Sequence, residues 1–155
     1  SASVPRLRIG AGRPQKILVG ERRIWLAWHG GDEPFEVWAR QPGEAGVRAT
    51  GDGSTVMLPA MTLRPGPLTI SVRDGASRAV DMVVEVVATM STPPDFSQAA
   101  PTELARTYLQ AGWVALQGDG AFLLEAAIRL SAIADRYPAA EALRLGLAFG
   151  ERPRP

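Results

Sequence analysis

Residues 23–40 constrain the fold more than any other stretch, because apolar positions alternate on both sides of a break that contains glycine and proline. The positions of one face are Ile24, Leu26 and Trp28 before the break, and Phe35, Val37 and Ala39 after it. Alternation with a period of two is typical of a strand that buries one face, and a Gly/Pro break is typical of a turn. We therefore expect residues 23–40 to form two paired strands, which hold three of the four tryptophans.

Further short apolar runs, separated by turn-forming residues, continue to residue 87. In the clearest of them, residues 79–87, one face carries Val80, Met82, Val84 and Val86. The Asp-Gly pairs at positions 52–53 and 74–75 indicate turns, because this dipeptide readily adopts the positive φ angles of tight hairpins. About seven short strands separated by such turns predict an antiparallel β-sandwich over residues 1–90.

A linker and a helical region are predicted to follow. Residues 91–101 are rich in proline and small polar side chains, which favour an extended connection. The apolar period then becomes helical, so we expect a helical hairpin with a third helix over residues 102–150. The fold class is therefore α+β, and the apolar helix faces are expected to pack on the sandwich.

The second helix of this region has further predicted features. We expect Asp119 to cap its start and Pro138 to end it just after Tyr137. Glu125 and Arg129 are four residues apart, so we expect an ion pair between them on the outer side of the helix.

Two family resemblances are visible. The order of Trp28-His29-Gly30-Gly31, Pro34-Phe35-Glu36-Val37, Leu63-Arg64-Pro65-Gly66-Pro67-Leu68 and Val72-Arg73-Asp74 resembles immunoglobulin-like or fibronectin-type-III-like bacterial modules over residues 5–90. That resemblance implies a sandwich of immunoglobulin type, although this region has neither cysteine nor tyrosine. The helical region resembles one tetratricopeptide unit through Tyr108, Ala111-Gly112, Ala126, Leu130, Ala134 and Pro138.

Composition excludes several classes of function. The chain has no cysteine, so thiol nucleophiles, thiolate zinc sites and redox pairs are excluded. A net charge of +1 argues against a nucleic-acid partner. No apolar run approaches the roughly 18 residues of a membrane span, so we expect membrane attachment only through an anchor outside this sequence.

Two further features bear on where the protein resides. The abrupt start, without a signal pattern, leads us to expect a leader or anchor that has been removed. The chain has 17 basic residues, and Lys16 is the only lysine among them, which points to a GC-rich bacterial genome. We expect the periplasm or cell envelope, with the cytoplasm as the alternative.

Basic residues gather near the start of the chain, at Arg6, Arg8, Arg13, Lys16, Arg22 and Arg23. Such a cluster can meet lipid headgroups or an anionic polymer. Our preferred interpretation is solubilising charge on an edge strand.

Candidate catalytic groups are sparse. His29, Asp32 and Glu33 share one corner and could bind a metal or act as a base, but His29 is the only histidine, and we expect a polar loop. Asp52 and Asp119 each lie in a Gly-Asp-Gly triplet, where turn and cap roles explain them. No Gly-X-Ser-X-Gly nucleophile turn is present. The sixteen acidic residues leave a small carboxylate-dependent hydrolase open as the least favoured hypothesis.

The tryptophans are the main candidates for binding. If Trp28 faces the core, Trp25 and Trp38 lie on the opposite face of their sheet, where they could stack on sugars or hold a peptide. We favour the alternative that the helices bury them, with Trp113 as a reciprocal contact. The leading hypothesis is a non-enzymatic protein–protein interaction module without cofactor or metal, in which Trp25, Trp38 and Trp113 are possible partner-binding residues. A carbohydrate-binding module that uses Trp25 and Trp38 is the second hypothesis.

Overall fold

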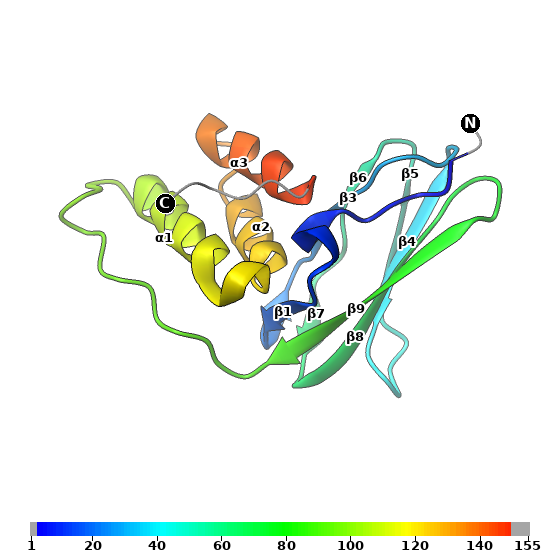
Figure 1. The fold of residues 1–155 in the computed structure, drawn as a ribbon, viewed down its shortest axis with the longest axis horizontal. Helices are drawn as coiled ribbons and strands as arrows, with labels where there is room; N and C mark the ends of the chain where they lie inside the picture. The colour runs from blue at the N-terminus through cyan, green and yellow to red at the C-terminus, as the bar shows by residue number, and fades with distance from the viewer. Residues whose placement is uncertain (1–2, 150–155) are drawn as a thin grey trace.

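The computed structural model describes residues 3–149, and within them it has an α+β fold with nine strands and three C-terminal helices (Figure 1). The strands are β1 (Gln15–Leu18), β2 (Gly20–Arg22), β3 (Trp25–Ala27), β4 (Phe35–Arg40), β5 (Val47–Gly51), β6 (Thr55–Met57), β7 (Met61–Leu63), β8 (Gly66–Arg73) and β9 (Ala79–Val87). The helices are α1 (Glu103–Leu116), α2 (Leu123–Ser131) and α3 (Pro138–Ala148), with short 3-10 turns η1 (Ile9–Gly12) and η2 (Gln117–Gly120).

The strands form one large sheet and two short ladders. The large sheet has the order β1-β9-β8-β4-β5, in which β1 pairs with β9 in parallel and the other neighbours are antiparallel. The ladders are β2–β7 and β3–β6. The fold class is confirmed, but the sheet is mixed rather than all antiparallel. Strands β2 and β7 were missed because three residues are too few to show a period of two.

The prediction that residues 23–40 form two paired strands is wrong. Strand β3 pairs with β6, whereas β4 pairs with β5 and β8. The connection between β3 and β4 runs along the surface, and Trp28 and Phe35 at its two ends meet in the core with ring centroids 5.2 Å apart, edge to face. Alternation was correct for the buried face of β4, but residues 24–28 are all buried, and alternation does not identify the partner strand.

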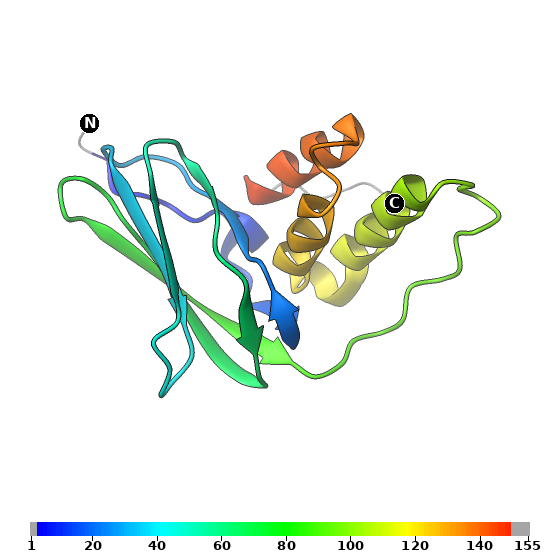
Figure 2. The same ribbon diagram turned by 180° about the vertical axis from the view of Figure 1, so that it is seen from behind.

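The two ladders and the inner face of the large sheet enclose one hydrophobic core. Buried side chains of the sheet, such as Ile17, Ile70 and Val84, belong to the same cluster as Ile24 and Leu26. All three residues of β3 are buried. Strand β3 is therefore a middle layer, with the large sheet on one side and helices α2 and α3 on the other (Figures 1 and 2).

The helical region packs on this middle layer and on β1. Residues 88–102, which include the predicted linker, contain neither helix nor strand and carry the chain from β9 to α1 (Figure 1). Helix α2 contacts α1, α3, β1 and β3. It ends at Ser131 rather than at Tyr137, so the predicted length of the second helix was wrong. No helix within residues 3–149 has the length and apolar character needed to cross a membrane.

The start of α2 is capped from another element. Asp119 does not cap it: this residue has φ +52° and pairs with Arg13 at 2.5 Å. Instead the Gln15 side chain, reaching from β1, accepts a hydrogen bond from the Leu124 backbone N–H at 2.9 Å and donates one to the Gly120 carbonyl at 2.7 Å. A Cβ at Gly10, whose φ is +79°, would lie 2.2 Å from the Gln15 amide nitrogen, so glycine is required beside this side chain.

We expect the Gln15→Ala substitution to lower the free energy of unfolding by about 2–4 kcal/mol, because it leaves the buried Leu124 N–H and Gly120 carbonyl without their partner. Chemical denaturation measures this loss. Gln98→Ala, at an exposed position between β9 and α1, is the control and should change stability by less than about 0.5 kcal/mol. Equal stability of the two variants would contradict the capping role.

Candidate functional site

Two surfaces combine cationic and apolar groups, and the first lies on the outer face of the large sheet. We call it the Trp38 face, and it consists of Glu36, Trp38, Arg40, Arg48 and Arg73. These residues, with the loop that joins β4 to β5, line a hollow of about 450 Å³. Strand alternation places them there, because Val37 and Ala39 between them point into the core.

The tryptophan at the centre of this face is half-buried and has cationic neighbours. The Arg73 guanidinium lies over its ring, 5.2 Å from the centroid. Arg48 stands directly opposite Trp38 on β5, and cross-strand pairs of this kind place side chains on the same face. Three arginines against the single Glu36 make the Trp38 face cationic.

The other end of the same sheet face is acidic. Strand β9 carries Asp81 and Glu85 there, on either side of Val83, which is 63% exposed. Asp81 accepts a hydrogen bond from the Ser71 hydroxyl at 2.6 Å. The outer face therefore has opposite charges at its two ends, and only the β4–β5 end combines arginines with an aromatic ring.

The two edges of the large sheet differ. At β1, the outward N–H groups of Lys16 and Leu18 donate to the Ala121 carbonyl and to Glu125 Oε1, both at 2.8 Å. At β5, β4 is the only paired neighbour within residues 3–149. The open edge thus lies beside the Trp38 face, and an edge of this kind can pair with another strand.

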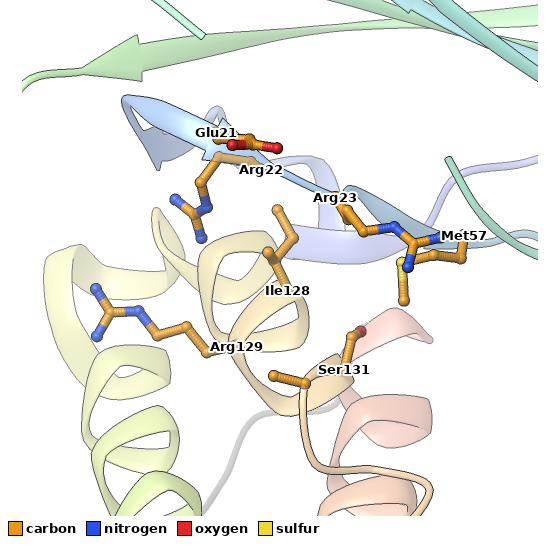
Figure 3. Close-up of a pocket in the computed structure, with 8 residues that line it drawn as sticks. Glu21, Arg22, Arg23, Met57, Ile128, Arg129 and Ser131 are labelled. Atoms are coloured by element: carbon orange, nitrogen blue, oxygen red, sulfur yellow. The ribbon is translucent and has the colours of Figure 1, made fainter. Parts of the chain in front are cut away.

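The second surface is a pocket between the β2–β3 segment and α2, which we call the junction pocket (Figure 3). It has a volume of about 360 Å³ and is lined by Glu21, Arg22, Arg23, Met57, Ile128, Arg129, Ser131 and Ala132. Figure 3 shows Arg22 and Arg23 extending from the strand segment in opposite directions, Arg22 toward the side of Arg129 and Arg23 toward Met57.

A buried carboxylate lies beside the junction pocket. The side chain of Glu125 is fully buried, and it accepts hydrogen bonds from Arg22 at 2.7 and 2.8 Å and from Arg129 at 2.8 Å. Burial by itself raises the pKa of Glu125, but the hydrogen bonds and charge of Arg22 and the hydrogen bond from Arg129 outweigh it, so the pKa lies below its ordinary value. The predicted Glu125–Arg129 pair is confirmed, but its predicted place on the outer side of the helix is wrong.

The predicted tryptophan candidates have different environments. Trp25 is only 4% exposed, and the Arg144 guanidinium from α3 lies 4.3 Å from its ring centroid. The prediction that the helices bury this ring is therefore correct, and its use as an exposed sugar platform is ruled out. Trp113 is half-buried in α1, which packs on α2, and its expected contact with Trp25 is replaced by Arg144. The same prediction is wrong for Trp38, which lies on the face of the large sheet away from the helices and is only half-buried.

The side chains of His29, Asp32 and Glu33 do not come together at one site. The exposed His29 ring packs against Phe149, with centroids 4.3 Å apart, whereas Asp32 pairs with Arg78 at 2.9 Å. Arg78 also binds Asp74. Burial raises the pKa of Asp74, but hydrogen bonds from the Asp32 and Arg78 backbones and from the Arg78 side chain lower it below its ordinary value. Nowhere between residues 3 and 149 do three histidine or acidic side chains gather to hold a metal ion.

Two residues of the basic cluster near the start of the chain form ion pairs with the helical region. Arg13 pairs with Asp119 and Arg22 pairs with Glu125, so two of its members join the β region to the helical region. Arg48 and Arg73 could not be predicted as site residues, because they lie on strands whose partners a local pattern does not identify. The cap from Gln15 could not be predicted either, because it comes from more than a hundred residues away in the sequence.

Comparisons with known proteins returned no match: no family model matches the chain, and neither does a curated protein or a solved structure.

We expect Glu125→Gln to lower the free energy of unfolding at neutral pH by about 3 kcal/mol, because two guanidinium groups lose their buried counter-ion. The folded-state pKa of Glu125 is depressed, so the stability it contributes is complete above the unfolded value near 4.5 and is lost as the pH falls through the lower folded value. The difference between wild type and variant should therefore shrink as the pH falls below 4.5.

Urea denaturation between neutral and acidic pH measures this difference. Glu44→Gln is the matched control, since Glu44 forms an exposed ion pair with Arg64 at 3.5 Å. Its effect should remain below about 1 kcal/mol at every pH. A difference for Glu125→Gln that stays constant with pH would contradict the assignment.

Proposed function

We propose that this protein is a non-enzymatic protein-binding module, in which the Trp38 face receives an extended acidic segment of a partner protein. One observation carries the proposal: a half-buried tryptophan lies among three arginines beside the open edge of a sheet. Tryptophan and arginine are the residues most often found at the energetic centres of protein interfaces.

The open edge supports an extended partner. A segment that pairs with β5 would continue the sheet through backbone hydrogen bonds, and every second side chain would lie on the outer face beside Arg48. Acidic side chains at those positions would meet the arginines, so charge complementarity would set the register and speed the encounter. Glu36 is the only acidic side chain in the lining of the hollow.

Carbohydrate binding has less support. Trp25 is buried, so one accessible ring remains of the two that the sugar platform needed, and Arg73 already lies over a face of that ring. The immunoglobulin-type topology, the tetratricopeptide-like character of the helices and a bacterial periplasmic or envelope location stay predictions, which this proposal does not require.

A short peptide in which aspartate or glutamate alternates with valine or threonine tests the proposal by calorimetric titration. We expect the peptide to bind the wild-type chain with an affinity that falls as salt is added. Its affinity for Trp38→Ala and for Arg48→Gln should be lower by a factor of about ten or more. Val83→Thr, on the same sheet face but at the acidic end, is the matched control and should bind normally.

Two further probes separate the alternatives. Two versions of the peptide can be N-methylated at alternate residues, one at the odd and one at the even positions. They should differ in affinity, because only one of them lacks the N–H groups that face β5. A version with lysine in place of the acidic residues should not bind. Equal binding of the lysine and acidic peptides would contradict the proposal, and saturable binding of soluble glycans that Trp38→Ala abolishes would favour the carbohydrate alternative.

A further inference from the structure

Beyond the proposed function, we infer that the junction pocket binds a small amphiphilic anion, a molecule with a carboxylate head and a short aliphatic chain. This site is separate from the Trp38 face: it lies between the β2–β3 segment and α2, and no residue lines both. The inference therefore does not depend on the outer face binding a protein.

The cationic part of the site arises from an imbalance of charge. Arg22 and Arg129 both bind the one carboxylate of Glu125, so two guanidinium groups share a single negative charge. Arg23 adds another cation at the pocket, and no ion pair within residues 3–149 uses it. Three arginines against Glu21 and Glu125 leave a net charge of +1 around the pocket.

A second polar feature adjoins the pocket at the end of α2. Ser131 lines the pocket, and its hydroxyl accepts a hydrogen bond from Arg144 at 3.3 Å. The Arg144 Nε group is buried without a hydrogen-bond partner among the described residues. The guanidinium of Arg144 thus brings a further positive charge to this side of the pocket. The Glu141 carboxylate interacts with it electrostatically and favours its charged form.

The rest of the lining is apolar. Met57, Ile128 and Ala132 line the pocket beside the arginines, and Figure 3 shows the Ile128 and Met57 side chains directed into the space between the strand segment and α2. A volume of about 360 Å³ lies at the small end of the range for ligand pockets, which suits a short chain rather than a lipid with two long ones. A net charge of +1 suits a singly charged head.

Octanoate is the probe, with octanol and octylammonium as matched probes of the same chain length. We expect saturable octanoate binding in an NMR titration, with backbone amide shifts concentrated at residues 21–23, at Met57 and at residues 128–132. Octanol should bind about tenfold more weakly and octylammonium more weakly still, because the head meets the arginines. Quenching or enhancement of Trp25 fluorescence should follow the same titration, since Trp25 stands opposite Met57 in the β3–β6 ladder.

Two variants address the two parts of the site. Arg23→Gln should weaken octanoate binding by about tenfold and leave octanol binding unchanged, whereas Ala132→Phe should weaken both by filling the pocket. Ala132 and Arg23 are exposed, so neither change disturbs the core, and thermal unfolding verifies this. Arg48→Gln, on the Trp38 face, is the control and should bind octanoate normally.

Three results would overturn the inference: equal binding of octanoate and octanol, amide shifts that map away from the junction pocket, or unchanged binding by a folded Ala132→Phe variant.

Discussion

A buried polar joint between β1 and the start of α2 is the interaction on which the rest of the structure depends. Gln15 caps the helix from the strand, and Glu125 from the helix binds a backbone N–H at the end of the strand. Because groups this deeply buried are costly to leave unpaired, the joint determines where α2 lies against the sheet. It also covers the edge of β1, and it places two arginines around one carboxylate beside a pocket.

The position of α2 decides the environments of the tryptophans. With α2 and α3 against β3, that strand becomes a middle layer, and Trp25 lies beneath Arg144. Trp38 lies on the far side of the large sheet, which the helices do not cover, and it remains partly accessible. The two surfaces proposed for binding thus arise from one asymmetry: the helices cover one face and one edge of the β region and leave the other face and the β5 edge open (Figure 2).

The parts of the fold that were predictable depend on local periodicity. The alternation of residues 79–87 gave both the bounds of β9 and its buried face, because a strand with one face in a core must alternate. The helical period predicted helices from residue 102 onward, and α1 begins at Glu103, where the Thr102 side chain accepts a hydrogen bond from the Ala105 backbone N–H. The candidate site was less predictable: the Glu125–Arg129 pair follows from helix geometry, but its third member, Arg22, is distant in sequence.

The sequence by itself determined the buried faces of β4 and β9, the change from strands to helices after the prolines, and the absence of thiol chemistry. These properties follow from spacing and composition along a few neighbouring residues. Only the tertiary structure decided that β3 pairs with β6, that β1 runs parallel to β9, and that Glu125 is buried while Trp38 is accessible. Strand partners and helix docking depend on contacts between residues far apart in the chain, and the local period of apolar residues does not predict those contacts.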